Sequence, residues 1–191
     1  MEPERQLDPH RMGDHLDRLY RAAWALCGSR ELAEDLTQDT FARVLAKPRF
    51  LRSEDDLGYL LRVLRNIFLD RRRRLARLPV EKPLESHVDH LHERASLQPE
   101  QLAEHRLVYE AVASLPDEFR DAVVAVDVIG MSYREAARTL RLSEGTVTSR
   151  VFRGRRDVAK QLAGETETRK GVSRESSRRS SRRRASAALR G

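Results

Sequence analysis

The sequence predicts an all-α protein of two small helical domains, an N-terminal helical bundle and a C-terminal helix-turn-helix domain, joined by a linker and followed by a disordered basic tail. Ala, Leu, Arg and Glu recur at the three-to-four-residue spacing of amphipathic helices. Alternating strand patterns are hard to find. Charged residues make up 35% of the chain and aromatic residues 5%, which favours small cores of Leu, Val and Ala. The 191 residues suffice for one ordinary domain or two small ones.

We expect the first domain over residues 14–78, after a polar and frayed segment over residues 1–13. Gly28 can end the opening helix, and Ser29 can cap the second helix. The second helix stops at the Lys47-Pro48 pair. The residues expected to face inward in these two helices are Leu16, Leu19, Tyr20, Ala23, Trp24, Cys27, Leu32, Ala33, Leu36, Phe41, Val44 and Leu45.

A third helix is expected from Leu57 to about Leu78, after the short loop "RFLRSEDD". It carries four consecutive arginines, 71–74, near its end. Its apolar stripe comprises Leu60, Leu61, Leu64, Ile67 and Phe68. These three helices would form the N-terminal bundle.

Residues 79–99 predict a linker, because they contain three prolines and no sustained apolar stripe. His87, His90 and His92 could hold a metal ion, but a linker without partner Cys or carboxylate ligands favours solvated histidines. We therefore expect no metal site, no cofactor and no catalytic residue.

The second domain is expected over residues 100–163. Pro116 can begin a helix that runs to Gly130, and Ser132 with Glu135 forms the S-x-x-E pattern of a capping box. Residues 164–191 are rich in Ser and Arg and cannot bury enough apolar surface to fold alone.

The stretch "SYREAARTLRLSEGTVTSRVFRGRR" predicts a helix-turn-helix, with a short capped helix, a tight turn that ends at Ser143, and a longer helix. Small residues of the first helix can pack against Val147 and Val151 of the second, which leaves the other face of the second helix outward. That face can enter a DNA major groove. The candidate DNA contacts are Thr148, Ser149, Arg150, Phe152, Arg153 and Arg156. The alternative is an ordinary solvated Arg-rich helix.

The stretch "SLPDEFRDAVVAVDVIGMSYREAARTLRLSEGTVTSRVFRGRRDVAKQL" resembles the C-terminal domain of bacterial extracytoplasmic-function (ECF) sigma factors. Independently, "AEDLTQDTFARVL" and "GYLLRVLRNIFLDRRRR" resemble the N-terminal sigma domain of that family. The two resemblances occur in the family's order and are joined by a linker. They imply that the helix-turn-helix contacts the −35 promoter element.

The resemblance also implies roles for the first domain. The −10 element would be recognised and melted by the third helix and the preceding loop, with the candidates Arg52, Ser53, Arg62, Arg65 and Asn66. The family docks the second helix on the clamp helices of the polymerase β′ subunit, and we carry this role onto Asp35, Gln38 and Asp39. Without the resemblance, these three residues indicate only a solvated acidic face.

The predicted function is therefore that of an ECF-type sigma factor, which performs no chemistry itself. Its expected partners are core RNA polymerase, through the β′ clamp helices and the β subunit, promoter DNA, and an anti-sigma factor. The alternative is a helix-turn-helix transcriptional regulator that acts without the polymerase core. A nuclease is disfavoured because the carboxylates are dispersed along helix faces.

The net charge of +7 resides mostly in the tail. Residues 165–191 hold nine Lys/Arg and three Asp/Glu, whereas the rest of the chain holds 28 and 27. DNA binding by the folded part must therefore depend on local patches. The sequence has no long apolar run and no signal-peptide pattern, so we expect a cytoplasmic protein without membrane insertion.

Overall fold

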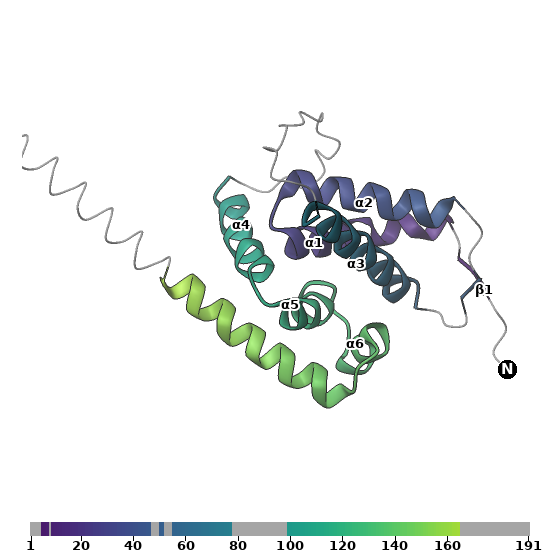
Figure 1. Ribbon diagram of the computed structural model, residues 1–191. Coiled ribbons are helices and arrows are strands. Elements are labelled where there is room, and N and C mark those ends of the chain that lie inside the picture. The colour runs from purple at the N-terminus through teal and green to yellow at the C-terminus, as the bar shows by residue number, and fades with distance from the viewer. Residues whose placement is uncertain (1–4, 8, 47–49, 52–54, 78–98, 165–191) are drawn as a thin grey trace, which may run out of the picture.

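The fold is that of a computed structural model that describes residues 5–7, 9–46, 50–51, 55–77 and 99–164. Apart from one pair of two-residue strands, the described elements are helices (Figure 1). The elements are β1 (Arg5–Gln6), η1 (Pro9–His15), α1 (Leu16–Cys27), α2 (Arg30–Leu45), β2 (Phe50–Leu51), α3 (Asp56–Leu75), α4 (Pro99–Ala113), α5 (Asp117–Val123), η2 (Val124–Val128) and α6 (Tyr133–Leu140), followed by a final helix over residues 144–164.

The predicted helix boundaries in the first half are set by capping groups. Gly28 ends α1 in the left-handed region, at φ 73°, and its N–H donates to the carbonyl of Trp24. The side chain of Ser29 accepts the N–H of Leu32 and caps α2. The Asp55 carboxylate accepts the N–H of Gly58 at 2.8 Å and caps α3. The cap residues predicted at the junction of the first two helices are thus confirmed.

The prediction of a frayed segment over residues 1–13 is wrong for its described part. Pro9–His15 forms a 3₁₀ helix, and the short strands β1 and β2 pair antiparallel. Leu7 and Met12 are 5% and 3% exposed and belong to the hydrophobic core. Two apolar residues in a polar segment were too weak a pattern to predict this.

The inward face predicted for α2 is correct except at its end. Leu36 and Val44 are buried, but Leu45 is 52% exposed. Leu45 is the last residue of the helix. The third helix also ends earlier than predicted, at Leu75.

The second half contains the predicted helix-turn-helix. Helix α5 continues through one π-helical turn, η2, in which the N–H of Ile129 donates to the carbonyl of Val124 at 2.9 Å. Gly130, at φ 80°, ends this helix. The capping box of Ser132 and Glu135 then begins α6, as predicted.

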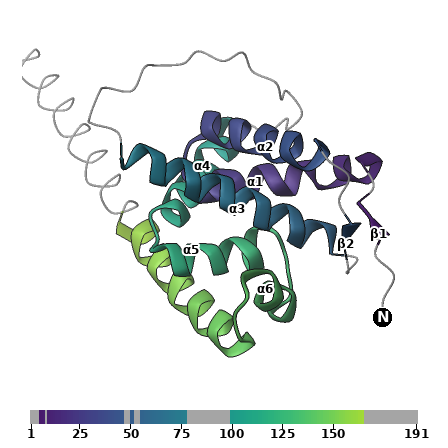
Figure 2. The same cartoon turned by 45° about the vertical axis from the view of Figure 1, so that its right-hand side comes forward.

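The N-terminal half, β1 to α3, and the C-terminal half, α4 to the final helix, pack on each other (Figure 2). They share one hydrophobic cluster. The rings of Trp24 in α1 and Tyr109 in α4 lie 4.8 Å apart. The Arg18 guanidinium donates to the Ile129 carbonyl from Nε at 3.0 Å.

The division into independent domains at residues 78 and 100 stays a prediction. The predicted linker, except Pro99, and the predicted tail, except Gly164, lie outside the described residues. Within the described ranges, no helix is long and apolar enough to cross a membrane.

Candidate nucleic-acid interface

The helix-turn-helix is held by small buried side chains and by two capping interactions. Ala136 and Ala137 of α6 are buried, as are Val147 and Val151 of the final helix, so the two helices approach closely. Arg141 makes the turn in the left-handed conformation, at φ 58°. The turn then closes through Leu142 N–H to Ala137 O and Ser143 Oγ accepting Thr146 N–H at 3.1 Å. The outward face of the final helix is thereby fixed relative to α6.

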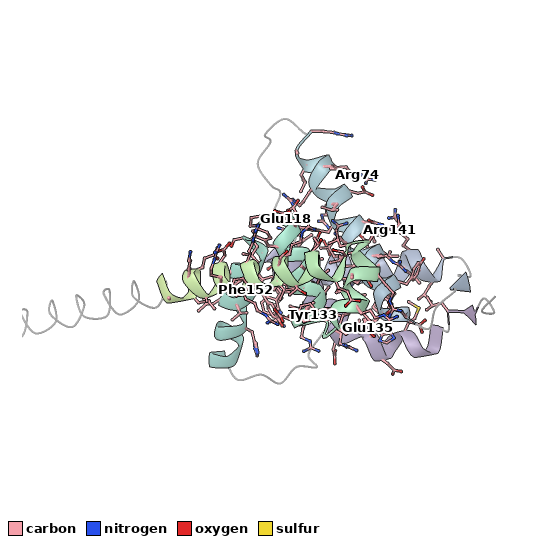
Figure 3. The ribbon with its side chains drawn as sticks, turned by 90° about the horizontal axis from the view of Figure 1, so that it is seen from below. Arg74, Glu118, Tyr133, Glu135, Arg141 and Phe152 are labelled. Atoms are coloured by element: carbon pink, nitrogen blue, oxygen red, sulfur yellow. The ribbon has the colours of Figure 1, made fainter. Side chains whose placement is uncertain are left out.

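The outward stripe predicted for the final helix is exposed. Phe152 is 69% exposed, the highest value among the large hydrophobic residues described as exposed. Thr148 and Ser149 are exposed, and their hydroxyls donate to backbone carbonyls one turn earlier, at 2.9 and 3.0 Å. Each hydroxyl oxygen can still accept a hydrogen bond. Figure 3 shows this helix across the near face of the molecule, with Phe152 labelled. An exposed Phe on a rigid helix suits contact with a thymine methyl group.

The arginines of the final helix differ in whether they form ion pairs with carboxylates. Arg153 is exposed and makes no ion pair with any residue that the structure describes. Arg150 pairs with Glu118 at 3.2 Å, and Arg156 with Asp157 at 3.3 Å. These two partners are exposed or half-buried, so both arginines remain within reach of a phosphate after a rotamer change.

Arg155, in contrast, has a structural partner. It forms a bidentate pair with Asp127 of η2, at 3.0 and 2.5 Å, and this hydrogen-bonded carboxylate raises the pKa of the guanidinium. The pair ties the final helix to the π-helical turn. The sequence did not predict this pair, because residues 28 positions apart leave no local pattern.

Three of the −10 candidates lie on α3, and the structure separates their environments. Asn66 is exposed and Arg62 is half-buried. The Arg65 Nε donates to Asp121 Oδ2 of α5 at 2.6 Å. Arg52 and Ser53 lie outside the described residues. Arg65 is thus paired with a carboxylate of α5, and its role at the −10 element stays a prediction.

Asp121 belongs to a larger polar contact between α3 and α5. Its side chain is 8% exposed, and burial raises its pKa against the lowering effect of Arg65. Asp117, one turn earlier, accepts from Arg72 at 2.6 Å and also pairs with Arg120. We call this set, with Phe68, the α3–α5 contact.

Phe68 lies at the centre of the α3–α5 contact. The guanidinium carbons of Arg72 and Arg120 lie 5.6 and 5.2 Å from its ring centroid. Arg120 is 5% exposed and donates to the carbonyl of Ala113 at 2.9 Å. Cations over an aromatic face are stabilised by the ring quadrupole. The sequence did not predict this contact, because its charged residues have the pattern of an ordinary helix surface.

The predicted polymerase-binding residues lie together on α2. Gln38 and Asp39 are exposed, and Asp35 pairs with Arg71 of α3 at 3.3 Å. Asp39 borders a polar cavity of about 420 Å³ between α2 and α3, lined also by Arg43, Ile67, Asp70, Arg71 and Arg74. The surface is thus of mixed charge, where the sequence indicated a patch of carboxylates and an amide.

A second cavity, of about 400 Å³, is mostly apolar. It lies between α1, α4, η2 and the final helix, with Val108, Tyr109, Val128 and Val158 among its walls. No cluster of three metal-ligating side chains occurs among the residues that the structure describes, and the three linker histidines lie outside them.

Two family models match the chain in the order of its helices. Residues 12–78 match sigma-70 region 2, and residues 105–158 match sigma-70 region 4. The chain is 34% identical to the ECF RNA polymerase sigma factor EcfG of Rhodopseudomonas palustris, over 73% of this chain and 76% of that protein. The chain belongs to the ECF group of sigma-70 RNA polymerase sigma factors.

Other relatives agree with this membership. The ECF sigma factor SigE of Mycolicibacterium smegmatis is 41% identical over 78% of this chain, and the match spans 59% of SigE. Among solved structures, the sigma factor RpoE of Bartonella quintana, in complex with the anti-sigma factor NepR, has a TM-score of 0.61 and 26% identity. That match covers 81% of this chain and 95% of RpoE.

The predicted family and fold class are therefore confirmed. Sigma factors of this family act with RNA polymerase in promoter-specific transcription initiation, and they are DNA-binding subunits, not enzymes. The roles of individual residues, and a cytoplasmic location, stay predictions.

Proposed function

We propose that this chain binds core RNA polymerase and directs it to promoters through separate contacts with the −35 and −10 elements. The observation that carries the proposal is the exposed stripe of the final helix, held outward by a capped and buried helix-turn-helix inside the region 4 match. Phe152 is 69% exposed within this stripe, where it can contact a thymine methyl group.

In the proposed −35 contact, some residues of the final helix contact base edges and others contact phosphates. Thr148, Ser149, Phe152 and Arg153 face the base edges, where Arg153 can donate to guanine and Phe152 can contact a thymine methyl. Arg150 and Arg156 contact phosphates, which positions the helix without specifying sequence. Their carboxylate partners, Glu118 and Asp157, are exchanged for phosphates on binding.

The −10 contact involves α3 and the loop before it. Asn66 is exposed on α3 and can hydrogen-bond the edge of an unpaired base. Arg62 and Arg65 follow the backbone of the single strand. Since flipping a base costs a few kcal/mol, a site that captures it favours the melted promoter. Arg52 and Ser53 of the preceding loop belong to the same proposal on the strength of the sequence resemblance.

The polymerase contact is placed on α2. Gln38 and Asp39 are exposed and adjacent there, and Asp35 lies one turn earlier. The family's docking on the β′ clamp helices supports this placement. We also propose contacts with the β subunit and control by an anti-sigma factor. Two structural relatives, RpoE and CnrH, were solved with the anti-sigma factor NepR and the cytosolic domain of CnrY, respectively.

The experiment separates the two DNA contacts on reconstituted holoenzyme. Phe152→Ala should weaken closed-complex formation on duplex promoter about tenfold, because one base contact is worth about 1–3 kcal/mol. Asn66→Ala should leave duplex binding intact and reduce melting, measured by 2-aminopurine fluorescence at the −10 element. A regulator that acts without polymerase would instead bind the duplex tightly alone, and Asn66→Ala would have no effect.

A further inference from the structure

We propose that the phosphate-binding surface of the final helix continues past Arg156, through Lys160, into residues 165–191, and that these residues bind the DNA backbone beside the −35 element. We call Lys160 together with residues 165–191 the basic extension. The inference rests on the proposed −35 role of the final helix. The ligand of the basic extension is the phosphate backbone of duplex DNA of any sequence, so it raises affinity without changing which sequence is preferred.

Lys160 lies on the same face of the final helix as the proposed DNA contacts. It follows Arg156 by four residues and Arg153 by seven, which is the spacing of one helical face. Val151, on the opposite face, is 1% exposed and belongs to the core. Lys160 is exposed, and it makes no ion pair with any residue that the structure describes. Its ammonium group is therefore available to a phosphate without first leaving a carboxylate.

The length of the final helix brings Lys160 to the DNA backbone when Phe152 lies in the major groove. At about 1.5 Å per residue, the eight residues from Phe152 to Lys160 span about 12 Å. The major groove is also about 12 Å wide, and a recognition helix contacts bases with its N-terminal residues. The end of this helix therefore projects beyond the groove, and Lys160 comes to the level of the phosphates.

The chain continues from this end of the helix into its most basic segment. Residues 165–191 hold nine Lys/Arg and three Asp/Glu, which gives +6 of the total charge of +7. Between residues 178 and 184, "RRSSRRR" holds five arginines and no carboxylate. Duplex DNA carries one negative charge per about 1.7 Å of its axis, so a dense run of arginines matches its charge. Because the segment begins directly after Gly164, it starts beside the backbone that Lys160 contacts.

The composition of residues 165–191 favours a phosphate backbone over other partners. The segment contains no aromatic residue, so it has no side chain on which an unpaired base can stack. Its large apolar residues are Val172 and Leu189 alone, too few to fill a hydrophobic groove on a protein. Charge without stacking or apolar groups suits the outside of a duplex.

The test measures binding of the full chain to a fluorescein-labelled, random-sequence DNA duplex by anisotropy at several salt concentrations. The slope of log affinity against log salt reports the number of phosphates neutralised, at about 0.9 per contact. Lys160→Gln should reduce the magnitude of this slope by about 1. The five-arginine variant should reduce it by about 4, since each lost contact counts about 0.9. This variant combines Arg178→Gln, Arg179→Gln, Arg182→Gln, Arg183→Gln and Arg184→Gln.

Two matched controls separate a local contact from a general effect of charge or sequence. Arg106→Gln removes one positive charge, as Lys160→Gln does, but from an exposed pair with Glu110 on α4, and should leave the slope unchanged. Ser180→Ala with Ser181→Ala alters the same segment between its arginines, keeps its charge, and should also leave the slope unchanged. Equal slopes in Lys160→Gln and Arg106→Gln would overturn the proposal, since net charge alone would then explain the result.

The five-arginine variant also tests a different partner. A wild-type salt slope in this variant would show that residues 165–191 do not contact DNA, and the proposal would be wrong. If the same variant also bound core polymerase more weakly than wild type, the arginines would instead contact an acidic surface of the polymerase.

Failure of the basic extension and failure of the proposed function give different results. If only the extension is wrong, wild type, Lys160→Gln and the five-arginine variant all support promoter-specific transcription with core polymerase and share one salt slope. If the function is wrong, none of the three supports transcription, whatever their salt slopes.

Discussion

Phe152 and Val151 are neighbours in the final helix, yet their exposed fractions are 69% and 1%. One side chain faces the core with Val147, and the other faces outward with the arginines. This division followed from the helical spacing of apolar residues, so the candidate −35 stripe was predictable from the sequence. The ion pairs of Arg65 and Arg155 were not, because each joins residues that are far apart in the chain.

Truncation of Phe152 should therefore reduce function, whereas truncation of Val151 should reduce stability. Phe152→Ala should change the free energy of unfolding by less than about 0.5 kcal/mol while reducing transcription from a −35-dependent promoter. Val151→Ala should cost about 2 kcal/mol of stability, since it opens a cavity in the core. Chemical denaturation and run-off transcription measure both effects. Equal loss of stability in the two variants would contradict the assigned faces.

Glu135 gives a pH-dependent prediction. Hydrogen bonds from the Ser132 side chain and backbone hold the pKa of the Glu135 carboxyl below its usual value of 4.5. The ionised carboxylate therefore stabilises the fold at pH above 4.5, and this stabilisation is lost as pH falls through the lowered folded-state pKa. Glu135→Gln should be less stable than wild type at pH 7, and the difference should shrink toward pH 3. A difference that is constant across this range would count against the capping role.

At the scale of elements, the helices were predicted well because caps and apolar stripes are local. Ser29, Gly130 and the Ser132–Glu135 box mark real boundaries. The π-helical turn η2 was not predicted, since "VAVDV" has the same pattern in either helix type. The 3₁₀ helix at residues 9–15 was missed because its burial depends on the neighbouring α1.

Gly154 marks the crossing of the final helix with α5. A Cβ there would lie 2.5 Å from Val123 Cγ2, whereas a Cβ at Gly145 would meet nothing within 4 Å. Gly154→Ala should destabilise the fold by about 1–2 kcal/mol, because the overpacked crossing costs more free energy than the added helix propensity provides. Gly145→Ala should stabilise by about 0.5 kcal/mol. Thermal unfolding of the two variants checks this contrast, and an equal effect of both would disprove the close crossing.

At the scale of the whole molecule, the sequence predicted two domains and the structure adds a shared core between them. The packing of the halves could not be predicted, because ordinary helix faces carry the residues concerned. Helix α3 thereby serves two surfaces, since it bears the −10 candidates and also packs beside α5 (Figure 2).

The shared core predicts one unfolding transition. Trp24 fluorescence and far-UV circular dichroism should report the same midpoint, as expected for a cooperative two-state unit. Arg18→Ala should lower that midpoint, because Arg18 bonds the Ile129 carbonyl across the halves. Two separate midpoints in wild type would show that the halves unfold independently.

Initiation at promoters by core RNA polymerase is the activity that we propose this chain confers. Run-off transcription on a pool of promoter fragments, with core polymerase alone, with wild type and with the Gln38→Ala/Asp39→Ala double variant, tests it most directly. We expect promoter-specific transcripts that require the chain and fall about tenfold in the double variant, since a loss of about 1.4 kcal/mol of interface energy is a tenfold loss of affinity. Absence of transcripts, together with tight sequence-specific duplex binding by the chain alone, would contradict it.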